Sequence, residues 1–90
     1  MKTLQVTKQF KKDIKKIRKQ GKDFTKLKNL LDIICEGKEL KTKYRDHKLV
    51  CNYKKARECH IESDWLLIYE MHEDIVKLRR TGSHAELFKM

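Results

Sequence analysis

The chain of 90 residues changes its hydrophobic period part-way along, and this change most restricts the fold that it can adopt. Up to residue 36, apolar side chains recur at spacings of three and four, which is typical of amphipathic helices. From residue 48 to 81 they alternate with polar side chains, which is typical of strands with one buried face. Two helices followed by a run of strands predict a small α+β domain in which helices cover a sheet.

Signals for helix starts follow a short N-terminal strand, which is expected at residues 2–7 with Leu4 and Val6 on one face. Thr7 is a suitable N-cap for a helix over 8–20, and Asp23 for a second helix over 24–36. Because the link between them is short, the helices are expected to pack as a hairpin against the sheet. Their apolar stripes consist of Phe10, Ile14 and Ile17 in the first and of Phe24, Leu27, Leu30, Leu31 and Ile34 in the second.

The second half of the chain predicts a curled antiparallel sheet. Four strand-like stretches, separated by short turns, cover residues 48–54, 56–62, 64–72 and 74–81. Ser83, followed three residues later by Glu86, forms a capping box that predicts a short C-terminal helical turn. A chain of this length supports one modest core, so residues 1–90 are expected to form a single domain.

Positive charge is concentrated in the N-terminal half. The formal net charge is +10, and residues 1–50 contain 16 basic and 6 acidic side chains, whereas residues 51–90 contain 7 of each. This asymmetry exceeds what solubility requires, and it favours a polyanionic partner such as nucleic acid.

Cysteine usage and hydropathy indicate a chain that stays in the cytoplasm and requires no cofactor. The three cysteines form no Cys-x-x-Cys pair and are expected to be small buried hydrophobes. No apolar run approaches the roughly 18 residues of a membrane span, and the N-terminus lacks the apolar segment of an export signal. A metal site composed of His47, Cys51, Cys59 and His60 is rejected, because the spacing fits no common ligand pair and adjacent strand residues point to opposite faces.

Four polar residues near strand ends are candidates for catalysis. Taken singly, each histidine of the chain is more often a structural residue than a catalytic one. Strand parity nevertheless permits His60, Asp64, Arg80 and His84 to meet at one edge of the sheet. Two imidazoles, with an ordinary pKa of roughly 6.5, can serve as base and acid at neutral pH. A guanidinium can stabilise the charge on a phosphate in the transition state, and a carboxylate can orient a histidine.

This set of residues favours RNA over DNA as the substrate. The set needs no metal if the substrate supplies the nucleophile, and RNA offers its 2′-hydroxyl, which DNA lacks. Among the aromatic residues, Trp65 and Phe88 are the candidates for stacking on bases. Tyr53 and Tyr69 are weaker candidates, and Tyr69 is more consistent with core packing.

Three motifs in order carry a resemblance to a known family. They are Asp-His-x-Leu from residue 46, Arg-Glu-x-His-Ile-x-x-Asp-Trp-Leu-Leu-Ile-Tyr from residue 57, and Arg-Thr-Gly-Ser-His-x-Glu-Leu-Phe from residue 80. With these motifs the whole chain resembles the YafQ-like branch of the RelE/ParE superfamily of toxins from bacterial type II toxin–antitoxin modules. The resemblance implies a small α+β ribonuclease that enters the ribosomal A site, cleaves translated mRNA, and is neutralised by a cognate antitoxin.

The resemblance also implies a role for each matching residue. His84 would be the general acid, and His60 with Asp64 would form the base side. His47 would hold the scissile phosphate, Arg80 would stabilise its charge, and Phe88 would position a base. The basic helices would bind ribosomal RNA through Lys8, Lys11, Lys12, Lys15, Lys16 and Lys19.

Two alternatives remain at this point. A toxin of the ParE type has the same fold but poisons DNA gyrase without catalysis, and it has no evident use for the histidine set. A basic nucleic-acid-binding module would use its histidines only to contact phosphate, and would bind with a steep salt dependence and no turnover.

Overall fold

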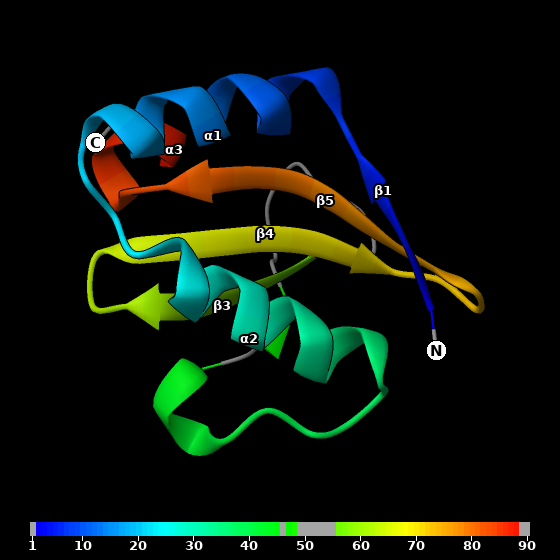
Figure 1. Cartoon of the computed structure of the whole chain (residues 1–90). Helices are drawn as coiled ribbons and strands as arrows, with labels where there is room; N and C mark the ends of the chain where they lie inside the picture. Colours follow the sequence, from blue (N-terminus) through cyan, green and yellow to red (C-terminus); the bar gives the residue numbers. More distant parts are fainter. Residues whose placement is uncertain (1, 46, 49–55, 89–90) are drawn as a thin grey trace.

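Helices and strands follow one another in the order that the two hydrophobic periods predict, and the predicted α+β class is confirmed. A computed structural model describes residues 2–45, 47–48 and 56–88. The elements are β1 (Thr3–Val6), α1 (Lys8–Lys19), α2 (Phe24–Cys35), the 3₁₀ turn η1 (Thr42–Tyr44), β2 (His47–Lys48), β3 (Ala56–Glu62), β4 (Trp65–Met71), β5 (Ile75–Gly82) and α3 (His84–Phe88) (Figure 1). Most of the strand expected at 48–54 lies outside the described residues.

Both long helices begin at the predicted caps. The Thr7 hydroxyl accepts a hydrogen bond from the Phe10 backbone N–H at 3.1 Å. The Asp23 carboxylate accepts one from the Thr25 N–H at 2.9 Å. These bonds satisfy amide groups that the first turn of a helix leaves without an intrahelical partner.

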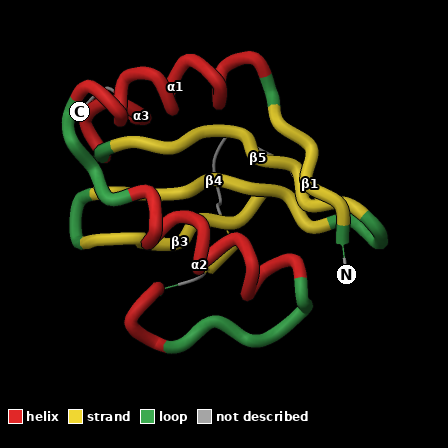
Figure 2. The backbone as a smooth tube through the Cα atoms, viewed as in Figure 1, coloured by secondary structure: helices red, strands yellow, loops and turns green. Residues whose placement is uncertain are grey.

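The strands form one mixed sheet in the order β1-β5-β4-β3-β2. Strands β2 to β5 pair antiparallel, as the alternating pattern predicts. The first strand, β1, returns to the edge of the last, β5, and pairs with it in parallel from Thr3 opposite Ile75 to Val6 opposite Leu78. Figure 2 shows the strands side by side as one layer, with α1 running along β5 and α2 crossing β3.

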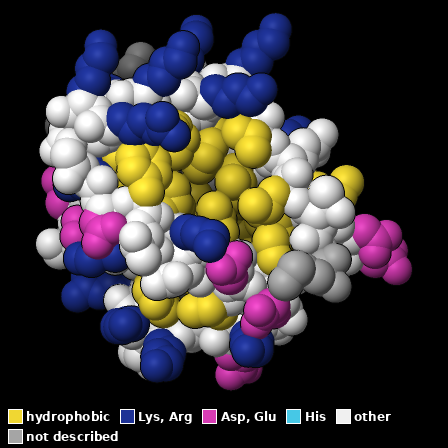
Figure 3. Space-filling view, in the orientation of Figure 1, with side chains coloured by type: hydrophobic (Ala, Val, Ile, Leu, Met, Phe, Trp, Pro, Cys, Tyr) yellow, Lys and Arg dark blue, Asp and Glu magenta, His cyan; other side chains and the backbone are white. Residues whose placement is uncertain are grey.

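The larger apolar core lies between the sheet and the two long helices. Helix α1 packs on β5 and α2 on β3, so the two helices are spread over the sheet. The buried residues of this core are Phe10, Ile17, Leu27, Leu30, Ile34, Cys35, Cys59, Trp65, Leu67, Tyr69, Val76 and Leu78. The space-filling view of this side shows lysines and arginines along α1 and a hydrophobic area between the helices (Figure 3).

A smaller core lies on the opposite face of the sheet. Ala56, Leu66 and Ile68 from β3 and β4 pack there with Leu87 of α3. The short helix α3 therefore covers part of the face that the long helices leave open. Residues that alternate with the larger core along β3 and β4 point to this second face.

Two expectations from composition concern the cysteines and the membrane. Cys35 and Cys59 are buried, as expected for small hydrophobes, while Cys51 lies outside the described residues. Burial raises the pKa of the Cys35 thiol. Within the described ranges, no helix has the length and apolar character that crossing a bilayer requires.

Candidate active site

The register of the sheet brings three of the predicted site residues to the face that carries α3. His60 lies opposite Leu66, which lies opposite Gly82. In the neighbouring row, Ile68 lies opposite Arg80. His84 comes two residues after Gly82, at the start of α3. His60, Arg80 and His84 therefore share the face opposite the long helices, and Asp64 lies in the turn between β3 and β4.

A β-bulge gives Arg80 its place on this face. Tyr69 pairs with Leu78 and Ile68 with Arg80, so Arg79 is an extra residue in β5. In a regular strand, Arg80 would share the core face with Leu78, two residues earlier. The bulge moves Arg80 to the α3 face and gives Thr81 the core position.

The two imidazoles of the site lie close together. The ring centroids of His60 and His84 are 5.8 Å apart, and the ring planes are inclined by 52°. The His60 side chain is only 11% exposed, whereas the His84 side chain is more open. A base and an acid that each approach one oxygen of the same phosphodiester to about 2.6–3.2 Å fit this separation.

Each histidine has a carboxylate beside it. An oxygen of Asp64, Oδ1, accepts the His84 backbone N–H at 3.3 Å and lies 3.8 Å from His84 Nδ1. Glu58 Oε1 lies 3.6 Å from His60 Nε2, beyond hydrogen-bond length but close enough for charge to matter. Sequence reasoning assigned Asp64 to the side of His60, but its contacts in the structure are with His84.

Glu58 was not singled out in the sequence analysis. It is buried, with only 5% of its surface exposed. The signal that could have found it is its position two residues before His60, which puts both side chains on one strand face. The other ring nitrogen of His60, Nδ1, is buried without a hydrogen-bond partner among the described residues.

The short helix α3 is fixed by the predicted capping box. Ser83 N–H donates to Glu86 Oε1 at 3.0 Å, and Glu86 N–H donates to Ser83 Oγ at 3.2 Å. The Glu86 carboxylate also accepts from Lys16 Nζ at 2.9 Å and from Gln20 Nε2 at 3.2 Å, which ties α3 to α1. Gly82 has φ +152°, and a Cβ there would lie 3.3 Å from Glu86 Oε1, so a side chain at this position would be strained and would crowd the capping box.

These contacts make Glu86 a source of pH-dependent stability. The Ser83 N–H, followed by Lys16, lowers the pKa of Glu86 from 4.5 to about 2. Because the pKa is depressed by folding, this stabilisation is complete above pH 4.5 and is lost as the pH falls from 4.5 toward 2. The Lys16 side chain is largely exposed, so solvent screens the ion pair and reduces the contribution to about 1–2 kcal/mol.

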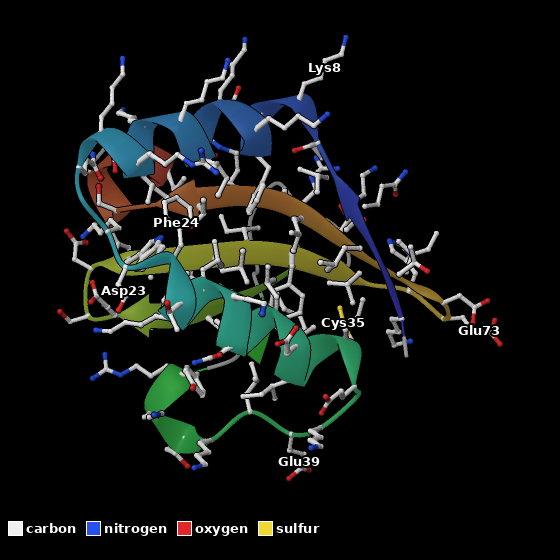
Figure 4. The ribbon with its side chains drawn as sticks, in the orientation of Figure 1. Lys8, Asp23, Phe24, Cys35, Glu39 and Glu73 are labelled. Carbon is white, nitrogen blue, oxygen red and sulfur yellow. The ribbon has the colours of Figure 1, made fainter. Side chains whose placement is uncertain are left out.

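Glu86→Gln is therefore expected to lower the free energy of unfolding at pH 7 by about 1–2 kcal/mol. The difference from wild type should disappear near pH 2, where the native carboxylate also becomes protonated. Urea unfolding at several pH values measures both. Glu39→Gln, in the exposed loop after α2, is the matched control and should stay within about 0.5 kcal/mol (Figure 4). A Glu86→Gln difference that persists unchanged at pH 2 would contradict the account.

The prediction that Trp65 stacks on an RNA base is wrong. Its side chain is 0% exposed in the larger core, and its indole Nε1–H donates to Thr81 Oγ1 at 2.9 Å. A residue enclosed in this way does not stack on an RNA base. Two further predicted residues are only partly described. His47 is in β2, opposite Glu58 of β3, and Phe88 is the last residue of α3, but the side chains of both lie outside the described part of the structure. Tyr53 lies outside the described residues altogether.

The remaining histidine lies far from the site. His72 is exposed, next to Glu73 at the tip of the hairpin between β4 and β5, at the opposite end of the sheet from α3 (Figure 4). Its Nε2 lies 2.9 Å from Glu70 Oε1. His72 is thus available as a control for the two candidate histidines of the site, His60 and His84.

The lysines of α1 form an exposed basic surface. Figure 4 shows Lys8 pointing away from the sheet, and the other lysines of the predicted RNA-binding set are also exposed. Lys16 has an additional structural role through its ion pair with Glu86. Among the residues that the structure describes, no group of three or more histidine, cysteine or acidic side chains is arranged to hold a metal ion.

Comparison with known proteins assigns the family. Residues 2–89 match the family described as the bacterial toxin of type II toxin–antitoxin systems, YafQ. The chain belongs to the YafQ family. An mRNA interferase toxin YafQ from Escherichia coli strain B is 41% identical over 81 residues, which cover 89% of this chain and 88% of that protein.

Solved structures agree with this assignment. YafQ in the DinJ–YafQ complex of Escherichia coli has a TM-score of 0.89 and 38% identity, covering 98% of this chain and 99% of the other. A copper-bound mutant toxin from Helicobacter pylori has a TM-score of 0.93 and 36% identity, covering 98% and 100%. The predicted resemblance and fold are therefore confirmed.

Proposed function

We propose that residues 1–90 form one toxin domain of a type II toxin–antitoxin module, an mRNA interferase that cleaves translated mRNA in the ribosomal A site. The pairing of His60 with His84, at 5.8 Å between ring centroids on the face opposite the long helices, carries the proposal. Similarity to the mRNA interferase YafQ supports the choice of substrate.

The proposed reaction is an intramolecular transfer within the RNA. His60 removes the proton from the 2′-hydroxyl, and the 2′-oxygen attacks the adjacent phosphorus. The bond from phosphorus to the 5′-oxygen breaks as His84 gives its proton to that oxygen. The products are a 2′,3′-cyclic phosphate and a 5′-hydroxyl. Glu58, 3.6 Å from His60 Nε2, stabilises the positive charge on the ring after it accepts the proton.

Two other residues act on charge and geometry around the phosphate. Arg80, on the same sheet face, stabilises the negative charge that develops on the phosphate oxygens. Asp64 holds the N-terminus of α3 through the His84 N–H and so orients the acid. His47 and Phe88 keep the roles implied by the resemblance, holding the phosphate and positioning a base.

The reaction so proposed needs no metal or other cofactor, because the RNA itself supplies the nucleophile. A similar toxin from Helicobacter pylori is copper-bound, so chelation of metal ions distinguishes the two cases. Cleavage by this chain should continue at an unchanged rate in EDTA, provided that the ribosomes are held intact by a fixed free Mg²⁺ concentration.

The proposed partners follow from charge and from the relatives. The exposed lysines of α1 bind ribosomal RNA, and the ribosome presents the mRNA to the opposite face of the sheet. A cognate antitoxin neutralises the toxin, as DinJ is bound to YafQ in the Escherichia coli complex. The toxin acts in the cytoplasm, where translating ribosomes are found.

Purified protein should be added to programmed ribosomes and, separately, to a DNA gyrase supercoiling assay. The proposal predicts cuts in the mRNA that are phased with the codon in the A site, and supercoiling that proceeds normally. Inhibited supercoiling without RNA cleavage would instead support a toxin of the ParE type. Salt-sensitive RNA binding without any cuts would support a binding module.

A further inference from the structure

One carboxylate interrupts the buried stripe of the basic helix α1. Asp13 is three residues after Phe10 and four before Ile17, where the helical period predicts an apolar side chain. It is the only acidic residue of this helix, and it is 6% exposed. Because burial of a charge is costly without partners, the groups around Asp13 indicate what it does.

Asp13 closes the edge of β5 where β1 has ended. The pairing of β1 with β5 stops at Leu78, while β5 continues toward the active site. Beyond that point, the Thr7 hydroxyl donates to the Arg79 carbonyl at 3.1 Å. Asp13 Oδ2 accepts the Thr81 backbone N–H at 3.2 Å. The side chains of Thr7 and Asp13 thus make hydrogen bonds to the edge of β5 that a longer β1 would otherwise make.

The same carboxylate binds Arg80 through two nitrogens. Arg80 Nε donates to Oδ2 of Asp13 at 2.8 Å, and Nη2 donates to Oδ1 at 3.3 Å. Gln9 Nε2 donates to Oδ1 at 3.3 Å and supports the carboxylate from the preceding turn of α1. The planar guanidinium is therefore fixed in orientation, while 22% of the Arg80 side chain remains exposed.

We propose that Asp13 is a positioning residue for RNA cleavage. It holds the guanidinium of Arg80, whose register puts it on the sheet face of His60, in the orientation that receives the scissile phosphate. This inference rests on the role proposed above for Arg80. The orientation is set during folding, so the transition state meets a donor that needs no rearrangement. The carboxylate also offsets part of the arginine charge, which weakens ground-state attraction of the phosphate.

Loss of the Asp13 charge is expected to change kcat more than KM. Asp13→Asn keeps an oxygen for the Thr81 N–H but lacks the charge that holds Arg80. We expect a kcat about 10- to 100-fold lower, with KM changed less than about 3-fold, because orientation matters most in the transition state. Asp32→Asn, which removes an exposed carboxylate from α2, is the matched control and should leave both constants unchanged.

A double-mutant cycle distinguishes positioning from support of the fold. If Asp13 acts through Arg80, Asp13→Asn should cost less than about 2-fold in a protein that already carries Arg80→Ala. Losses that multiply in the double mutant would overturn the positioning role and leave the role of Arg80 intact. Full activity in Arg80→Ala would overturn both roles. Thermal unfolding of each variant accompanies the rates, so that loss of folded protein is not counted as loss of catalysis.

A measurement without RNA tests the contact itself. In nuclear magnetic resonance, the Arg80 Nε–H should exchange slowly with water in wild type, because it donates to Asp13 at 2.8 Å. The exchange should be at least about 10-fold faster in Asp13→Asn and unchanged in Asp32→Asn. Equal exchange in wild type and Asp13→Asn would overturn the inference even if the chain cleaves RNA as proposed.

Discussion

Replacing His84 by alanine is expected to lower the rate of RNA cleavage about 100-fold or more, because the leaving 5′-oxygen loses its proton donor. His60→Ala should have an effect of the same order, since the 2′-hydroxyl then loses its base. Single-turnover cleavage on programmed ribosomes measures the chemical step. The double variant should be little slower than either single one, because an acid and a base that act in one concerted step fail together.

The histidine at the far end of the sheet provides the control. His72→Ala removes an exposed imidazole that is paired with Glu70, far from α3 (Figure 4). Its rate should stay within about 2-fold of wild type, as expected of a surface substitution away from the site. A rate for His84→Ala equal to that of His72→Ala would remove His84 from the mechanism and leave His60 to be tested with Glu58 and Asp64.

The second large effect is expected from a change in the substrate. A single 2′-deoxy nucleotide at the scissile position should abolish cleavage at that codon, because no other group in the proposed reaction attacks the phosphorus. The loss should be at least about 1,000-fold, comparable to the removal of a catalytic group that the reaction cannot replace. Primer extension across the codon measures the cut.

Matched substrates make this test specific. A 2′-deoxy nucleotide one position downstream leaves the nucleophile in place and should reduce cleavage only slightly. Cutting that continues at the 2′-deoxy scissile nucleotide would mean that water or a protein group attacks instead, and the proposed roles of His60 and His84 would be wrong.

Local signals predicted most of the secondary structure. Thr7 and Asp23 are N-caps, and Ser83 with Glu86 forms the capping box, because each signal acts within three residues of its partner. Alternation also predicted the faces of β3, where Cys59 enters the larger core and His60 turns to the other face. Such features depend on residues that are close in sequence, so they can be predicted from the sequence alone.

Features that depend on distant partners were not predictable in this way. The parallel pairing of β1 with β5 has no local signal, since its two strands are joined through the whole domain. The bulge at Arg79 has none either, because two consecutive arginines show no period. Asp13 lies 67 residues before Arg80, and only its position within an apolar stripe indicated an unusual environment.

The burial of Trp65 could have been predicted from strand parity, but its proximity to Asp64 was given more weight. Its place beside Asp64, at the turn between two strands, favoured a role near the substrate. The parity that it shares with Leu67 and Tyr69 predicts the core face instead, and the structure places all three there. Parity along a strand was therefore the better guide than proximity to a candidate catalytic residue.

The chemical identity of the new RNA ends, at cuts made on programmed ribosomes, tests the central claim most directly. Transfer to the 2′-oxygen leaves a 5′-hydroxyl on one fragment and a 2′,3′-cyclic phosphate on the other. Polynucleotide kinase should therefore label the downstream fragment without prior phosphatase treatment. A 5′-phosphate with a free 3′-hydroxyl at the cut would contradict the account, because only attack by an external nucleophile produces those ends.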